Sequence, residues 1–361
     1  MSVEFYNTKK IPEDLKNAYI AVFEKTISED NLVEGSACRS FEEKFAKYLD
    51  IKFVLGVGNG FDAIRISLLA LGIGPGDRVA VPAHTFIATW FAVQSVGAIP
   101  VGVDVTGDGQ LDLDLLEREI GLACVIPVHM HGTHCDMKRL VNWARRLGIR
   151  IIEDCAQAAG LSIQGKKAGT WGDVGAFSFY PTKNLFALGD GGAISTNHND
   201  IYEAARSVSR YGTHANDKYT HIRLGQNSRL DTLQAAFLEI NLQNLDQWNL
   251  RRSQIAEMYD ENLGHLRPNL VDVQESVFHH YVIYIDNRDN LKAQLAHVGI
   301  STEIHYPNFA ASEVNPNETV KFPVASGLSS RGLSLPISPW QTLEDTDYVV
   351  DKVLRILNGR Q

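Results

Sequence analysis

Short apolar runs alternate with helical patterns over the first two thirds of the chain. The runs are rich in β-branched residues and mostly uncharged, which is typical of strands that are buried on both faces of a parallel sheet. The expected strands are Phe53–Val57, Arg78–Val81, Ile99–Val105, Ala123–Val128, Arg150–Glu153, Val174–Phe179 and Gly192–Thr196. The expected helices between them are Phe61–Leu71, Ile87–Val96, Leu113–Ile120 and Met137–Leu147. This alternation predicts an α/β fold whose mostly parallel sheet carries helices on both faces.

Both ends of the chain follow other patterns. Before the first strand, Leu15–Ser28 reads as a helix, Gly35–Ala37 as a loop, and Ser40 as the cap of a second helix with Glu43 in the capping-box position. After Asn227 strands become fewer. The expected elements there are two helices within Leu230–Leu263, a strand over Phe278–Ile285, a helix over Leu291–His297, a short strand at Glu303–His305 and a closing helix over Thr346–Leu357. We therefore expect a large α/β domain over residues 1–248 and a smaller α+β domain over residues 249–361.

Composition narrows the class of protein. The chain has 361 residues and a formal net charge of −9 at pH 7, so it lacks the overall basic character that nucleic-acid binding requires. No stretch has the pattern of a signal peptide or a membrane span, which favours a cytoplasmic protein. The four cysteines form neither a CxxC pair nor a zinc spacing, so neither a disulfide framework nor a metal site is expected.

Candidate chemistry follows directly after the predicted strands, where open α/β sheets bind ligands. The glycine-rich turn Gly56–Asp62 leads into a helix, whose N-terminus could bind a phosphate; a plain strand-to-helix turn is the alternative. Lys183 follows a buried strand among aromatic residues, where poor solvation would lower the pKa of its amine and make it nucleophilic. An ordinary surface lysine is the alternative.

Three further residues could complete such a site. Asp154 at a buried strand end needs a cation, either a protonated pyridine nitrogen or a structural arginine. Ser178 could donate to a phosphate or be a plain strand serine, and Phe86 could stack on a flat ring or belong to the core. An activated lysine, a carboxylate, an aromatic ring and a phosphate turn together describe a site for pyridoxal phosphate.

These residues lie in segments by which the chain resembles the DegT/DnrJ/StrS family of sugar aminotransferases, which are pyridoxal phosphate enzymes of fold type I. The similarity extends from about Pro12 to Leu357. It rests on the segments GVGNGFDAI, VPAHTFIATW, PVHMHG, IIEDCAQAAG, GAFSFYPTKN, LGDGGAI, NSRLDTLQAA and IHYP.

The resemblance implies a role for each matching residue. Lys183 matches the lysine that forms a Schiff base with the cofactor, and Asp154 matches the partner of its pyridine nitrogen. Gln157 matches a residue near the phenolic oxygen, and Phe86 matches the residue that stacks on the ring. The residues that match the phosphate site are Ser178, Gly60 and Phe61 through their backbone, and Asn227 from the other subunit. That last role implies a homodimer with shared active sites.

Two positions depart from the family pattern. Threonine or serine often stands where this chain has Phe61, so the phosphate would rely on backbone N–H groups there. Tyrosine is usual at the position of His131. The presence of Lys183 speaks against the related 3-dehydratases, in which a histidine replaces the lysine.

The resemblance also implies a reaction. The segments HTFIATW, GNGFDAI and YPTKNLFALGD are most similar to the branch that uses L-glutamate to convert a dTDP-linked 3-keto-6-deoxyhexose into a 3-amino sugar, through the pyridoxal and pyridoxamine forms of the cofactor. Candidate contacts to sugar or diphosphate, each with an equally weighted structural alternative, are Tyr180, Tyr211, Tyr219, Arg229, His305 and Tyr306.

Three other functions are compatible with parts of the pattern. The first is an aminotransferase for a 4-keto sugar, and the second is a regulator that binds the cofactor without catalysis. The third is a nucleotide-dependent dehydrogenase, which the absence of a GxGxxG segment with a following ribose carboxylate argues against.

Overall fold

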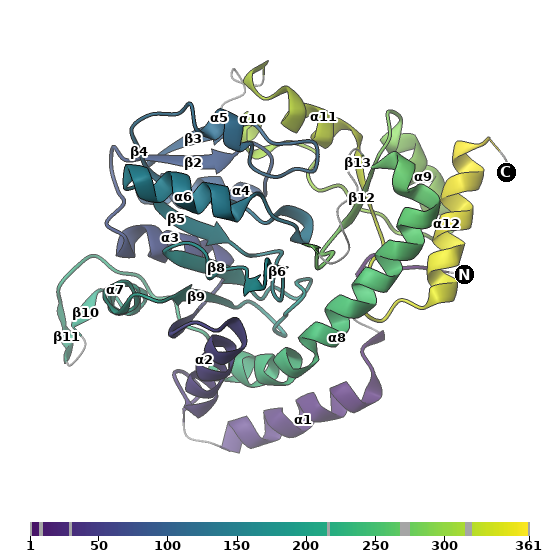
Figure 1. The fold of residues 1–361 in the computed structure, drawn as a ribbon. Coiled ribbons are helices and arrows are strands. Elements are labelled where there is room, and N and C mark those ends of the chain that lie inside the picture. Colours follow the sequence, from purple (N-terminus) through teal and green to yellow (C-terminus); the bar gives the residue numbers. More distant parts are fainter. Residues whose placement is uncertain are drawn as a thin grey trace.

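A seven-stranded sheet forms the centre of the computed structural model, which describes residues 2–6, 10–28, 31–214, 217–267, 275–314 and 320–359. The strand order is β1-β9-β8-β5-β4-β2-β3 (Figure 1). These strands are β1 (Phe53–Val57), β2 (Arg78–Pro82), β3 (Ile99–Val103), β4 (Leu122–Val125), β5 (Arg150–Asp154), β8 (Val174–Ser178) and β9 (Gly192–Thr196). β9 runs antiparallel to its two neighbours, and the other neighbouring pairs are parallel. The predicted α/β class with a mostly parallel sheet is confirmed.

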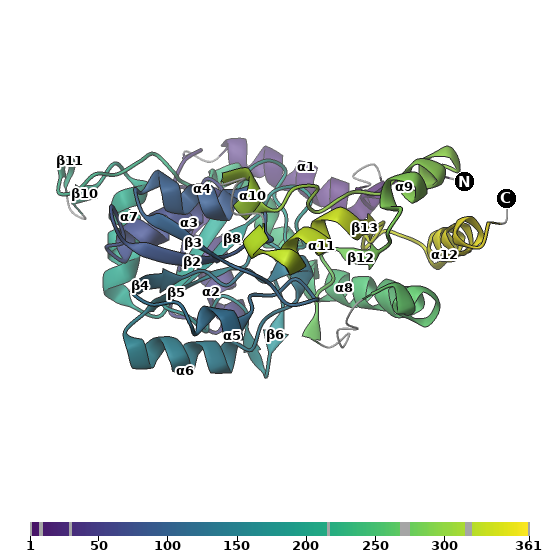
Figure 2. The ribbon, with the colours of Figure 1, turned by 90° about the horizontal axis from the view of Figure 1, so that it is seen from above.

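Helices cover both faces of this sheet (Figure 2). On one face lie α2 (Ser36–Leu49), α6 (Met137–Leu147) and the first part of α8 (Thr232–Leu263). On the other lie α3 (Gly60–Ala70), α4 (Ile87–Ser95) and α7 (Asn199–Ser209). Successive residues of a strand point to opposite faces. Ile151 therefore packs in the hydrophobic cluster under α2, α6 and α8, and Ile152 packs in the cluster under α3, α4 and α7. Burial on both faces is why the strands read as continuous apolar runs.

A smaller hydrophobic core lies beyond one edge of this body. It packs the second part of α8 against β12 (Tyr281–Tyr284), β13 (Gly332–Leu335), α9 (Arg288–His297) and α12 (Leu343–Leu357). β12 and β13 are antiparallel. Val3 also belongs to this core, because its N–H donates to Gly299 and its carbonyl accepts from Ser301. The N-terminal segment is therefore anchored to the C-terminal part of the chain.

The remaining elements are short, apart from α1. They are α1 (Glu13–Ser28), α5 (Leu113–Leu116), α10 (Ala310–Val314), α11 (Pro323–Arg331), the 3-10 turns η2 (Met130–Gly132) and η3 (Gly264–Leu266), and the pairs β6 (Ser162–Ile163) with β7 (Lys166–Lys167) and β10 (Thr213–His214) with β11 (Asp217–His221). Within the described ranges, no helix combines the length and apolarity that a membrane span requires.

Two predictions about the helices are wrong. The second helix begins at Ser36 rather than at Ser40, because the preceding turn packs on α8: the N–H of Gly35 donates to Thr232 over 3.0 Å, and Cys38 is buried. The stretch predicted as two helices is the single helix α8, which contains neither glycine nor proline to interrupt it. Residue 248 lies in the middle of α8, so the division into domains 1–248 and 249–361 stays a prediction.

Candidate active site

A pocket of about 400 Å³ opens beyond the carboxyl ends of the parallel strands. Its walls come from the turn before α3, the start of α4, the end of β5, the loop after β8 and the C-terminal core. Among the predicted site residues, those that line it are Gly60, Phe61, Phe86, Asp154, Gln157, Ser178, Tyr180, Lys183, His305 and Tyr306. The loops at the carboxyl ends of the strands thus bring together side chains that lie far apart in the sequence.

Lys183 lies in the turn after β8, where its N–H donates to the carbonyl of Tyr180. The amine faces the pocket but is closely surrounded by protein. Burial lowers its pKa to about 8, and the negative charge of Asp154 partly opposes this change. A neutral amine is a competent nucleophile and base, so the residue has the property that the sequence predicts for it.

Asp154 ends β5 and is only 5 % exposed. Its Oδ1 accepts the N–H of Ala156 over 3.1 Å, and its Oδ2 accepts the hydroxyl of Thr89 over 2.8 Å. Burial raises the pKa of this carboxyl, while the two hydrogen bonds and the charge of Lys183 lower it. Sequence reasoning missed Thr89, although a buried threonine within the apolar pattern of α4 is a usable signal.

The turn before α3 packs closely against β8 and forms a cradle that is suited to an anion. A Cβ added to Gly60 would lie 2.7 Å from the Cβ of Ser178, so only glycine permits this approach. Asn59 caps α3 by accepting the N–H of Asp62. In the described structure the N–H groups of Gly60 and Phe61 have no protein acceptor, and they add to the positive end of the helix dipole.

Gln157 is held in the pocket wall by two hydrogen bonds. Its Oε1 accepts the N–H of His131 over 2.6 Å, and its Nε2 donates to the hydroxyl of Tyr306 over 3.1 Å. One amide hydrogen stays available to a ligand. Phe86 is 53 % exposed and packs at 5.4 Å from the ring of Tyr306, so the alternative that it is a core residue is wrong.

Histidines and an N-terminal tyrosine complete the wall. His279 and His280 line the pocket together with His305, and Tyr6 joins them from the N-terminal segment. Burial lowers the pKa of each of these histidines, so their rings are neutral near pH 7. The hydroxyl of Tyr6 lies 3.4 Å from Nε2 of His280, and burial raises its pKa to about 12. Sequence reasoning missed all but His305; the adjacent pair His279-His280 was the available signal.

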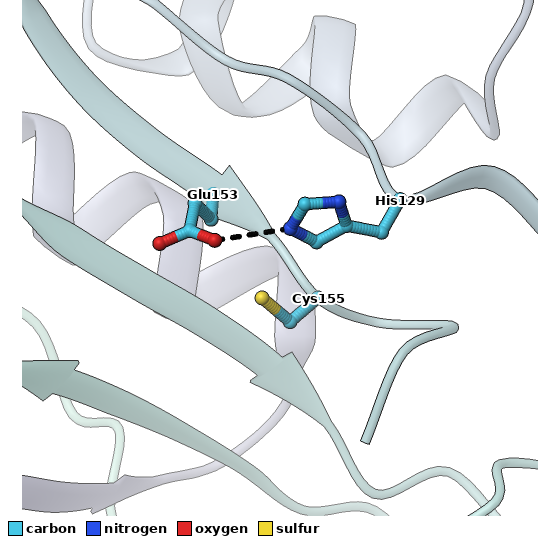
Figure 3. A group of neighbouring side chains, drawn as sticks. All are labelled: His129, Glu153 and Cys155. Carbon is cyan, nitrogen blue, oxygen red and sulfur yellow. Dashed lines mark hydrogen bonds and ion pairs between the residues drawn. The ribbon is translucent and has the colours of Figure 1, made fainter. Parts of the chain in front are cut away.

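His129, Glu153 and Cys155 form a buried cluster at the end of β5 (Figure 3). The Glu153 carboxylate accepts a hydrogen bond from Nε2 of His129, with 3.0 Å between the two atoms. It also accepts three backbone N–H groups, those of Gly169, Trp171 and Gly172. Four donors saturate the two oxygens of a carboxylate, so Glu153 has no lone pair left for a cation. We assign this cluster to anchoring the loop around Gly169 to the end of β5.

Four predicted residues do not line this pocket. They are Asn227, Arg229, Tyr211 and Tyr219. Tyr211 is 52 % and Tyr219 79 % exposed, and the hairpin of β10 and β11 projects away from the body of the molecule (Figure 1). The segment around Asn227 still lies beside the glycine turn, because Oγ of Ser228 accepts the N–H of Gly58 over 3.0 Å.

Comparison with known proteins gives concordant matches. The profile of the DegT/DnrJ/EryC1/StrS aminotransferase family matches residues 13–354. The "Erythromycin biosynthesis sensory transduction protein EryC1" of Saccharopolyspora erythraea is 39 % identical over 97 % of this chain and 98 % of its own length. The "dTDP-3-amino-3,6-dideoxy-alpha-D-galactopyranose transaminase" of Aneurinibacillus thermoaerophilus is 40 % identical over 89 % of this chain and 90 % of its own. The crystal structure of Streptomyces venezuelae DesV in complex with a ketimine intermediate superposes with a TM-score of 0.93 at 37 % identity, covering 100 % of this chain and 99 % of that one.

Proposed function

The chain belongs to the DegT/DnrJ/EryC1/StrS aminotransferase family, and from this premise we propose that it transfers an amino group from L-glutamate to a dTDP-linked 3-keto-6-deoxyhexose. The product is the corresponding 3-amino-3,6-dideoxyhexose, and the cofactor is pyridoxal phosphate. The observation that carries the proposal is the placement of Lys183 and Asp154 in one pocket with an anion cradle at Gly60.

The residues present fit this cofactor. The orphan N–H groups of Gly60 and Phe61 and the hydroxyl of Ser178 would hold its phosphate. The carboxylate of Asp154 would pair with a protonated ring nitrogen, which would also neutralise a buried charge. The free amide hydrogen of Gln157 would donate a hydrogen bond to the phenolic oxygen of the cofactor.

The reaction then uses the chain's own acids and bases. When bound, pyridoxal phosphate supplies an electron sink for the charge left on carbon by proton removal. Lys183 would hold the cofactor through its amine, and once free its Nζ would take the proton from the α-carbon of the donor and deliver it to the cofactor carbon that the amine had left. With the keto sugar, the same amine would carry out this proton transfer in reverse. Asp154 keeps the ring nitrogen protonated.

The two chemical half-reactions share one pocket, so substrate residues must serve both. Tyr180 is 52 % exposed, and it lines the pocket together with His305 and Tyr306. We assign these three residues to the sugar. Neutral histidine and tyrosine side chains bind hydroxyl groups without an additional charge.

We further propose a homodimer with shared active sites. Asn227, Arg229, Tyr211 and Tyr219 stay outside the pocket of their own chain, and their partial or full exposure supports a contribution to the pocket of a second copy. Asn227 would then reach the phosphate of the partner's cofactor, and the other three would contact its nucleotide sugar.

A regulatory role is the second candidate, because the name of the Saccharopolyspora relative describes a sensory transduction protein. Lys183 and Asp154 favour catalysis, since a pure sensor would need neither a proton-transferring amine nor a charge on the ring nitrogen. A 4-keto sugar is the alternative substrate.

The absorption spectrum of the purified protein with pyridoxal phosphate tests the proposal. We expect a visible band that L-glutamate bleaches, with formation of 2-oxoglutarate. Addition of a dTDP-linked 3-keto-6-deoxyhexose should restore the band, and NMR of the product should place the amine on C3. A band that glutamate leaves unchanged would favour the sensor, and an amine on C4 would contradict the 3-keto assignment.

A further inference from the structure

Among the residues that the structure describes, Arg252 is a buried cation to which no carboxylate is paired. The residue is 6 % exposed and lies in α8. Its Nη1 donates to the carbonyl of Ile337 over 2.8 Å and to that of Phe278 over 3.3 Å. Its Nε is buried and has no hydrogen-bond partner in the described structure. Buried charges are normally paired, so this guanidinium requires an explanation.

The guanidinium lies next to the active-site pocket. It lines a cavity of about 30 Å³ whose wall also contains Tyr6, Thr182 and Lys183. The same three residues line the main pocket, so they form the partition between the two spaces. Burial lowers the pKa of Arg252 to about 10, and its interaction with Tyr6 partly opposes this change. The arginine stays charged at neutral pH and can attract an anion to this side of the pocket.

The pocket itself offers few cations for an anionic amino donor. Its described lining contains no arginine, Lys183 is its only lysine, and its histidines are neutral. Lys183 is also the residue that must lose its charge to act as a base. A second cation near Lys183 would stabilise a bound dicarboxylate, and Arg252 of the same chain is adjacent through their shared cavity.

We propose that Arg252 binds a carboxylate of the amino donor, with the hydroxyl of Tyr6 as a second hydrogen-bond donor at the partition. This inference rests on the proposed function and adds the residue that binds a carboxylate of its donor. A cavity of about 30 Å³ suits a carboxylate and is too small for a sugar or a diphosphate. The cofactor phosphate has its own cradle at Gly60. Arginine binds carboxylates through charge-assisted hydrogen bonds, and Arg252 lines this cavity.

The test compares two unreactive acids on the cofactor-loaded protein by isothermal titration calorimetry. Glutarate carries two carboxylates, and valerate replaces one of them by a methyl group in a chain of equal length. We expect the unaltered protein to bind glutarate at least about tenfold more tightly than valerate, in line with a charge-assisted pair. Arg252→Met should lose this preference while its visible absorption band stays in place.

Arg251→Met is the matched control. Arg251 precedes Arg252 but lines a separate groove between α1 and α8, where it donates to Gln341. This variant should keep the glutarate preference. If Arg252→Met does not fold, Arg252→Lys decides, because lysine lacks the planar fork: the preference should fall at least about threefold.

Two results would overturn the assignment: an unaltered protein that binds valerate as tightly as glutarate, or a folded Arg252 variant that keeps the full preference. Failure of the proposed function gives a different result. In that case the unaltered protein shows no band with pyridoxal phosphate, or a band that L-glutamate does not bleach.

Discussion

Thr89 donates a hydrogen bond from Oγ1 to Oδ2 of Asp154 over 2.8 Å. Ala156 holds the other carboxylate oxygen, so both oxygens are oriented before any ligand binds. Thr89 is 1 % exposed and comes from α4, whereas Asp154 comes from β5. The orientation of the proposed nitrogen partner therefore depends on the contact between these two elements.

Thr89→Val tests this contact. Valine keeps the shape but removes a hydrogen bond that lowers the pKa of Asp154, so that pKa should rise. We expect kcat to fall about tenfold, as for the loss of one hydrogen bond to a charged group, and the acidic limb of the pH profile to move to higher pH. Thr89→Ser should retain both properties. An unchanged pH profile in Thr89→Val would show that the hydroxyl does not support the carboxylate.

The amine of Lys183 should reduce the stability of the cofactor-free protein. Its pKa is about 8 in the folded state and 10.5 in the reference state, so unfolding takes up protons between these values and stability rises with pH across that window. The cost is complete below pH 8 and disappears above pH 10.5, and we estimate it at roughly 2 kcal/mol after allowance for partial exposure.

Lys183→Met removes this cost together with the amine that we propose to be catalytic. Urea unfolding should show an advantage of the variant at pH 7 that shrinks as the pH approaches 10.5. The effect of methionine packing is independent of pH, so only the pH-dependent part is diagnostic. A difference that stays constant over the window would contradict the lowered pKa. The variant should also lose nearly all transamination.

Gly60→Ala should impair cofactor binding. The new Cβ would lie 2.7 Å from Ser178 and push the two sides of the cradle apart. We expect about tenfold weaker binding of pyridoxal phosphate in fluorescence titration, and a stability loss of about 1–3 kcal/mol. Gly74→Ala is the control, because its Cβ would meet only the carbonyl of Val96 at 3.8 Å. Equal cofactor affinity in both variants would contradict a role of the cradle at Gly60 in binding the cofactor.

Shared active sites predict complementation between two defective chains. Lys183→Ala removes the amine and Asn227→Ala removes the proposed contact to the partner's phosphate. A mixed dimer contains one site with both residues intact, so co-refolding the two variants should restore activity at limiting cofactor. Each variant refolded alone is the control. Activity that never exceeds the sum of the controls would contradict the shared site.

The sequence predicts most of the elements that position the pocket. Strands buried on both faces give apolar runs that local composition reveals, and the ends of those runs located Asp154 and Lys183. Element boundaries that depend on distant contacts were predicted less well. α2 begins a turn early because Gly35 and Cys38 contact α8 and the residues before it, which no local pattern encodes.

The residues that were missed contact the site through tertiary packing. Tyr6 reaches the pocket because Val3 pairs beside Gly299 and Ser301. Arg252 lines the small cavity next to the pocket because α8 continues past the main core. Thr89 reads as an ordinary residue of an apolar helix until its partner on β5 is known. In each case the sequence carries the residue type but not the contact.

The long helix α8 also constrains how the molecule can come apart. Its 32 residues place Leu238 and Leu245 in the main core and Ile255 and Tyr259 in the C-terminal core, without a break between them. Severing the chain within it would leave each fragment with an exposed apolar stripe. The two cores should therefore melt in a single cooperative transition, and neither should be recoverable as an independently folding piece.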